Sequence, residues 1–141
     1  MLAIDLKCPK DAWPFGLKGC VVIGIIKESG KDTTWLAFDV ADRSVSSVSG
    51  VISPGSDMPA EIEALKPVIF AVGNRTVWEW AHTDQEEFYK QIAKGKLNIG
   101  GDFREFARVT PRLIRLFEAT RIWANIDSIV EQLQPEEALL Q

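Results

Sequence analysis

The sequence predicts an α+β domain in which a five-stranded, mainly antiparallel sheet carries helices on one face. Residues 19–50 hold three apolar or alternating segments, and the turns between them are too short for a parallel crossover. Residues 67–73 and 96–101 add two further strand-like segments. From residue 102 onward, apolar residues recur at helical spacing, which supplies the helical layer.

Length and composition bound the answer before any motif is considered. We expect the 141 residues to form one domain, 1–141, with a core supplied by the 46% of residues that are apolar. Asp5 and Lys7 come too early for a signal peptide, so a cytoplasmic location is expected. The net charge of −4 is unevenly spread, with +5 on residues 90–121 and −9 on the remainder.

The first three strands are predicted as an antiparallel meander. Residues 19–28 form an apolar, β-branched run typical of a well-buried strand. Residues 33–40 alternate, which places Phe38 on the same face as its apolar neighbours two positions away. Residues 44–50 are more polar and fit an edge strand, and residues 53–61, rich in proline, glycine and serine, are expected to form a loop.

The middle of the chain contains one ambiguous segment. Residues 67–73 indicate a fourth strand, whereas residues 74–83 fit either a hairpin arm or a helix. A capping box is predicted from Thr83 and Glu86, and it would start a helix that Gly95 terminates. Residues 96–101 are the fifth strand.

The C-terminal part is expected to be helical from Asp102, which would cap the first helix. Thr110-Pro111 either kinks this helix or ends it and caps the next one. A last amphipathic stretch of a turn or two follows before Pro135.

Two glycines before this helix, Gly100 and Gly101, raise the question of phosphate binding. A phosphate loop requires lysine and a hydroxyl after its last glycine, but Asp102 occupies that place and would repel phosphate. We therefore expect the glycines to permit a turn or a close backbone approach.

Metal and nucleophile chemistry also lack support in the sequence. With His82 as the one histidine and Cys8 and Cys20 as the two cysteines, no Cys/His zinc spacing can be assembled. The cysteines are expected to be free thiols. No nucleophile–base set is recognisable, so we expect no catalytic residue, no cofactor and no metal, and acid/base chemistry of Asp or Glu is a minor alternative.

Four arginines fall at spacings that would align them on one side of a continuous helix: Arg104, Arg108, Arg112 and Arg115. They form either a solvated face or a surface for transient contact with anionic lipid headgroups. Nucleic acid is a poorer partner because the sequence pI is about 5.0.

Aromatic residues are abundant, with five tryptophans and seven phenylalanines. Trp78 and Trp80 are two positions apart, which is about 200° around a helix, so both cannot face the core. One of them is expected on an exposed or cavity-facing surface.

The spacing of several of these residues resembles the sterol carrier protein type-two family of lipid-binding domains, over about residues 19–120. The resemblance rests on Gly73, Trp78, Gly95-Lys96-Leu97 and Gly101-Asp102, with Trp35 at the aromatic position of the preceding strands. It implies that residues 75–82 are helical. It also implies that Gly100 and Gly101 turn a strand into a helix that covers an apolar cavity.

The resemblance implies non-enzymatic binding or transfer of a hydrophobic ligand such as a fatty acid, an acyl thioester or another lipid. The candidate cavity-lining residues are Phe38, Phe70, Trp78, Phe88, Ile92, Phe106, Leu113 and Phe117. The alternative is a protein-interaction or homodimerisation module with a closed core.

Overall fold

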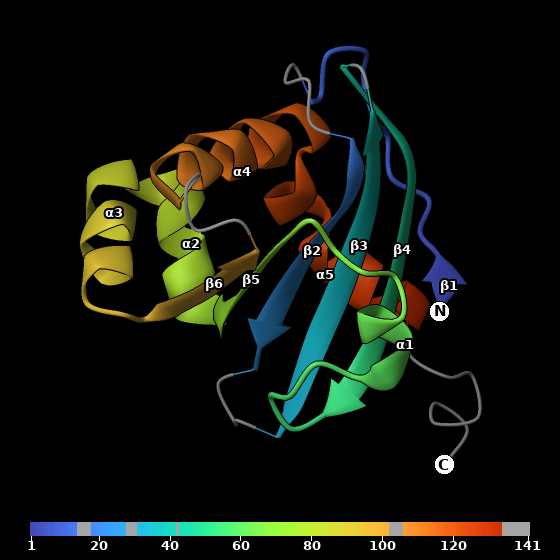
Figure 1. The fold of residues 1–141 in the computed structure, drawn as a ribbon, viewed down its shortest axis with the longest axis horizontal. Coiled ribbons are helices and arrows are strands. Elements are labelled where there is room, and N and C mark those ends of the chain that lie inside the picture. Colours follow the sequence, from blue (N-terminus) through green and yellow to red (C-terminus); the bar gives the residue numbers. More distant parts are fainter. Residues whose placement is uncertain (14–17, 28–30, 42, 102–105, 134–141) are drawn as a thin grey trace.

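The computed structural model describes residues 1–13, 18–27, 31–41, 43–101 and 106–133, with only the backbone for residues 101 and 106–110. The six strands are β1 (Leu2–Ala3), β2 (Gly19–Ile26), β3 (Asp32–Ala41), β4 (Ser44–Pro54), β5 (Ile69–Asn74) and β6 (Leu97–Gly101). The five helices are α1 (Ala60–Glu63), α2 (Arg75–Thr83), α3 (Gln85–Ala93), α4 (Phe106–Thr120) and α5 (Ile122–Leu133). The predicted α+β class is confirmed (Figure 1).

The strands form one mixed sheet in the order β1-β4-β3-β2-β5-β6. The predicted meander is present as the antiparallel β2–β3 and β3–β4 pairs. The pairing of β2 with β5 is parallel, which is possible because the long β4–β5 connection, with α1 in it, crosses back along the sheet. β1 is a further strand that the sequence did not predict, and it adds the N-terminus to β4.

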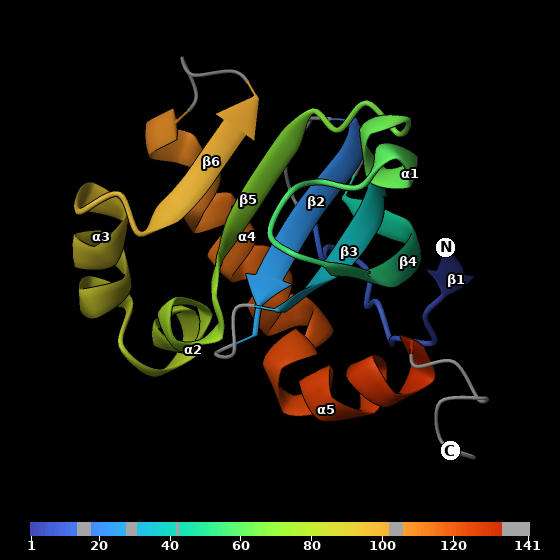
Figure 2. The ribbon, with the colours of Figure 1, turned by 90° about the horizontal axis from the view of Figure 1, so that it is seen from below.

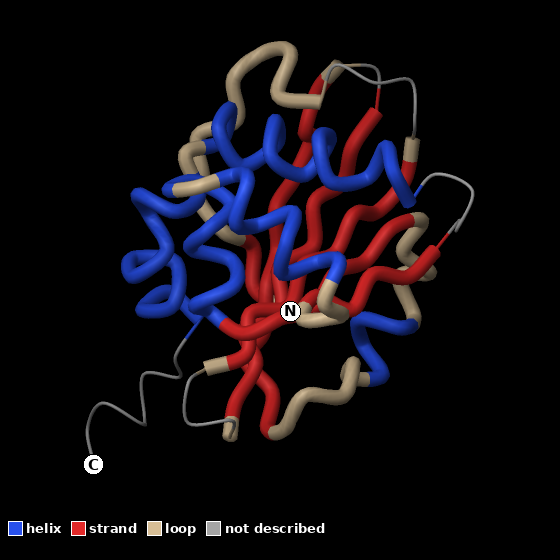
Figure 3. The backbone as a smooth tube through the Cα atoms, turned by 90° about the vertical axis from the view of Figure 1, so that its left-hand side faces the viewer, coloured by secondary structure: helices blue, strands red, loops and turns tan. Residues whose placement is uncertain are grey.

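The two faces of the sheet are covered differently. Figures 2 and 3 show α2, α4 and α5 on one face, which we call the helical face. The other face, which we call the outer face, carries α1. Alternate residues of β2 enter the two cores: Val21 and Ile23 face the helices, and Val22 packs with Ile62 of α1. Burial on both faces explains why β2 is a continuous apolar run.

The helix predicted for the ambiguous segment is confirmed as α2, but the predicted cap of the next helix is wrong. Thr83 is the last residue of α2, and its Oγ1 donates to the Glu79 carbonyl at 2.8 Å. Asp84 caps α3 instead by accepting a hydrogen bond from the Glu87 N–H at 3.2 Å. The sharp junction between α2 and α3 leaves only Asp84 in the extended conformation that a cap requires.

Gly95 ends α3 as predicted. It has a φ of 76°, and its N–H bonds to the Ile92 carbonyl while the Lys96 N–H bonds to the Gln91 carbonyl. This pair of bonds is the Schellman motif, which satisfies carbonyls at the end of the helix.

The segment predicted as a loop over 53–61 is partly ordered secondary structure, because β4 continues to Pro54 and α1 begins at Ala60. Farther along, α4 runs through Pro111 as one helix, and the break to α5 falls at Arg121, whose φ is 52°. The predicted cap at Asp102 lies outside the described residues.

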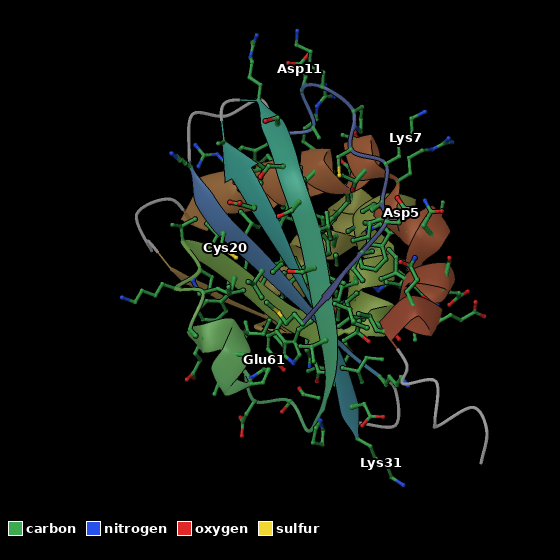
Figure 4. The ribbon with its side chains drawn as sticks, turned by 90° about the vertical axis from the view of Figure 1, so that its right-hand side faces the viewer. Asp5, Lys7, Asp11, Cys20, Lys31 and Glu61 are labelled. Atoms are coloured by element: carbon green, nitrogen blue, oxygen red, sulfur yellow. The ribbon has the colours of Figure 1, made fainter. Side chains whose placement is uncertain are left out.

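Figure 4 shows the N-terminal segment, with Asp5, Lys7 and Asp11, running along the sheet next to β4. Asp11 and Lys31 mark opposite ends of the sheet. The Ile4 N–H bonds to the Val48 carbonyl at 2.8 Å, and Trp13 is fully buried, so this segment closes one edge of the core.

Candidate functional site

An aromatic cluster fills the space between α2, α4 and α5. Trp78 of α2 lies 5.3 Å from Phe117 and 5.9 Å from Trp123, measured between ring centroids. Phe88 of α3 lies 5.9 Å from Trp78 on another side. The Phe117 and Trp123 rings meet edge to face at 5.3 Å, a favourable aromatic geometry. Trp78 of α2 therefore links its own helix to three others, α3, α4 and α5.

Trp78 also fixes α2 to the sheet. Its side chain is fully buried, and its Nε1 donates to the Gly24 carbonyl of β2 at 2.9 Å. Buried indole N–H groups usually have such a partner. Trp80, about 200° around the same helix, is only half-buried, as its spacing from Trp78 predicts.

Trp80 lines a pocket of about 370 Å³ between α2 and α5, which we call the α2–α5 pocket. Its apolar walls are Trp80, Trp123 and Ile126. Arg75, Thr76, Glu79, His82 and Thr83 complete the lining. The volume lies within the range of about 300–1,000 Å³ that small-molecule sites occupy.

A second pocket of about 180 Å³, which we call the α4 pocket, lies on the other side of His82 and Trp123. Both residues line both pockets, and their rings stack at 6.3 Å with an interplanar angle of 18°. Phe117 and Ile114 of α4 form its apolar wall. His82 is exposed, so its ring covers the Trp123 ring from the solvent side.

Trp123 carries an unusual polar atom. Its Nε1 is buried and has no hydrogen-bond partner among the described residues. Buried polar groups are nearly always hydrogen-bonded, so an indole N–H without an acceptor marks a place where one is missing. Trp123 was not among the residues predicted to line the cavity, because nothing in its spacing shows that α5 returns to α2.

The charges at the α2–α5 pocket are already paired with one another. Arg75 lies 3.1 Å from Asp127 of α5 and 3.5 Å from Glu79 of α2, measured from guanidinium nitrogen to carboxylate oxygen. Only the Arg75–Asp127 pair joins the N-terminal end of α2 to α5, because Glu79 lies one turn along α2 itself. They also leave the cation at the pocket rim flanked by two carboxylates.

The structure brings together most of the predicted cavity residues that it describes. Phe38, Trp78, Phe88, Ile92, Leu113 and Phe117 belong to the core on the helical face. Phe106 lies in α4, but its side chain is outside the described part. Of these, Trp78 and Phe117 contact the Trp123 ring from the core.

Phe70 lies apart from this group, on the outer face of the sheet. Its ring covers Gly100 of β6, the residue directly opposite it, so a Cβ at position 100 would overlap the ring. This contact answers the question raised by the glycines, at least for Gly100: the missing side chain makes room for an aromatic ring. Phe70 and Met58 help to line an outer hollow of about 550 Å³.

The described part of the arginine stripe consists of two side chains on α4. Arg115 is exposed and Arg112 is half-buried. Arg104 and the side chain of Arg108 lie outside the described part. Contact of these arginines with an anionic membrane stays a prediction.

Cys8 and Cys20 are free thiols, as predicted. Burial raises the pKa of both, and the negative charge of Asp39 raises that of Cys20 further. In the described ranges, no group of three or more His, Cys, Asp and Glu side chains is arranged to hold a metal ion. No helix in the same ranges is long and apolar enough to cross a membrane.

The fold and site thus define an α+β domain with a helix-covered mixed sheet and an aromatic-lined pocket on its helical side. The chain is similar to sterol carrier protein 2 of Yarrowia lipolytica, with 15% identity over 72% of this chain and 69% of that one, and a TM-score of 0.46. For sterol carrier protein-2 like-3 of Aedes aegypti the identity is 18%, the coverage 73% and 82%, and the TM-score 0.46. A conserved hypothetical protein of Thermus thermophilus is 11% identical over 79% of this chain and 73% of that one, with a TM-score of 0.49.

The first two of these structures carry the name of the family that the sequence resembles. No protein-family model matches the sequence, and no curated protein matches it.

Proposed function

We propose that this protein binds and transfers a hydrophobic ligand without catalysing a reaction on it. The observation that carries the proposal is the pair of pockets on either side of the His82–Trp123 stack. Trp80 and Ile126 offer apolar contact in one pocket, and Phe117 does so in the other. Trp123 adds apolar surface to both pockets.

The energetics favour a ligand of low polarity. Each methylene group removed from water contributes about 0.8 kcal/mol, so an alkyl chain needs few polar contacts to bind. The stacked ring of His82 is an exposed cover that can move without disturbing Trp78, which stays bonded to β2. The resemblance to lipid-binding domains agrees with this kind of ligand.

The arrangement of polar groups supports binding in preference to catalysis. The hydroxyl of Thr83 at the pocket donates to a backbone carbonyl, so it is engaged in the helix and is not bonded to His82. Glu79 is paired with Arg75. A hydroxyl nucleophile is commonly activated by a hydrogen bond to a general base, and neither contact provides one.

The proposal is tested by native mass spectrometry of the purified protein, by lipid extraction, and by displacement of a bound fluorescent fatty acid. We expect Trp80→Ala to weaken probe binding because it removes one wall of the α2–α5 pocket. Tyr89→Ala is the matched control, since Tyr89 is an exposed aromatic residue of α3 that does not line the two pockets.

Failure to recover lipid, together with failure to displace the probe, would overturn the proposal. Concentration-dependent sedimentation without lipid uptake would then favour the alternative of an interaction or homodimerisation module. Equal loss of binding in Trp80→Ala and Tyr89→Ala would place the site elsewhere.

A further inference from the structure

Trp123 carries a buried hydrogen-bond donor next to the apolar parts of both pockets. Its ring is held by Trp78 and Phe117 on the inner side and is stacked by His82 on the outer side. The Nε1 atom is buried and lacks an acceptor among the described residues. An indole nitrogen can only donate, so the group that completes it must bring an acceptor oxygen or nitrogen.

Trp78, the other tryptophan of the cluster, has a hydrogen-bond partner for its indole N–H. Trp78 donates to the Gly24 carbonyl at 2.9 Å and is fully buried. Trp78 therefore has no capacity to bind a ligand through its N–H. Trp123, at a ring distance of 5.9 Å, has this capacity and lines both pockets.

The charges around the pockets decide which kind of acceptor fits. The described charged side chains of the two linings are Arg75 and Arg121 against Glu79 and Glu118, two of each sign. Asp127 adds a second carboxylate to Arg75. An anionic ligand head would therefore enter a region without excess positive charge and would lose its hydration there. A neutral acceptor loses far less on burial.

We propose that the indole N–H of Trp123 is the specificity determinant of this site, and that it selects lipids whose head is a neutral hydrogen-bond acceptor, such as an alcohol or a ketone, over ionised fatty acids. This inference rests on the proposed function, because it requires that a hydrophobic ligand enters at Trp123. Because Nε1 has almost no exposed surface in this structure, the ligand oxygen reaches it only when a covering side chain moves aside. The alkyl chain then extends along Trp80 or Phe117.

The first test compares 1-dodecanol with dodecanoate at pH 8, where the acid is ionised, as competitors of bound N-phenyl-1-naphthylamine. We expect dodecanol to displace this neutral probe at roughly tenfold lower concentration, because a hydrogen bond to a buried donor replaces a costly buried charge. Trp123→Phe should remove most of this preference while the probe itself still binds. Tyr89→Phe is the matched control, since Tyr89 lines neither pocket and the Trp123 donor is kept, so the preference should be kept.

The second test reads the donor directly through the indole N–H signals in a ¹H–¹⁵N NMR spectrum, assigned with Trp123→Phe. Saturation with dodecanol should shift the Trp123 signal downfield, while that of Trp78, already bonded to Gly24, should move little. If probe and dodecanol both bind but the Trp123 signal stays in place, or if dodecanoate competes equally well, the inference is wrong. If neither compound binds, the proposed function itself fails.

Discussion

The indole ring of Trp35 lies directly on Gly24, its partner across the β2–β3 pair, so a Cβ at position 24 would come within 2.8 Å of Trp35 Cζ3. On the same outer face, Phe70 covers Gly100 across the β5–β6 pair. Two aromatic rings thus occupy the space left by two glycines. The rings differ in freedom: Trp35 is fully buried and bonded through Nε1 to Ser53 Oγ at 3.0 Å, whereas Phe70 is half-buried beside the outer hollow.

This difference predicts that Gly24→Ala is more destabilising than Gly100→Ala. Trp35 cannot move without losing packing and a hydrogen bond, so we expect Gly24→Ala to cost about 1–3 kcal/mol of unfolding free energy. Phe70 can swing toward the hollow, so Gly100→Ala should cost about 1 kcal/mol or less. Urea unfolding measures both values. The reverse order would show that Phe70, and not Trp35, is the constrained ring.

Two tryptophans of α2 should separate stability from binding. Trp78→Phe removes the hydrogen bond to Gly24 from a fully buried site, and we expect it to cost about 1–3 kcal/mol. Trp80→Phe changes a half-buried wall of the α2–α5 pocket and should change stability by about 0.5 kcal/mol. Thermal unfolding compares the stability of the two variants, and titration with the fluorescent probe compares their ligand binding. Equal losses of stability would contradict the assignment of Trp80 to the pocket.

The start of α3 provides a test of the cap. Asp84→Ala removes the side-chain acceptor of the Glu87 N–H and should cost about 1 kcal/mol. Thr83→Ala removes an exposed hydroxyl whose acceptor is the Glu79 carbonyl inside α2, so it should change stability by less than about 0.5 kcal/mol. Chemical denaturation of the two variants decides between Asp84 and Thr83 as the cap. A larger loss for Thr83→Ala would restore the capping box read from the sequence.

The thiol of Cys20 should react slowly at neutral pH. Burial and the nearby Asp39 both raise its pKa, and a raised pKa lowers the fraction of reactive thiolate at any pH below it. We measure the rate of iodoacetamide alkylation in a Cys8→Ala background. We expect this rate to rise at a higher pH than the rate for free cysteine. Asp39→Asn removes the negative charge and should move the curve to lower pH. An unchanged curve would leave burial as the sole cause.

Local chemistry in the sequence was sufficient for much of the fold. The positive φ of Gly95 and the Schellman bonds around it follow from glycine placed after an amphipathic segment. The alternation in residues 33–40 put Phe38 on the same face as Leu36 and Val40, as found in the core. The two-residue spacing of Trp78 and Trp80 predicted that one of them leaves the core but not which one: Trp78, predicted to line the cavity, is fully buried, and Trp80 lines the pocket. These features depend only on neighbours in the chain.

Other features depended on which segments meet in space. Both faces of β5 are apolar, so periodicity could not tell that Phe70 faces α1 while Ala71 faces the helices. The parallel pairing of β5 with β2 and the return of Trp123 to Trp80 and His82 join segments far apart in the sequence. Likewise, the indole N–H of Trp123 is buried without a partner among the described residues, whereas that of Trp78 meets the Gly24 carbonyl of a strand far away in the sequence. The sequence by itself determined most helices and strands and their apolar faces, because propensity and periodicity act locally. Tertiary packing decided which faces form the proposed site, because burial and hydrogen-bond satisfaction are properties of the assembled chain.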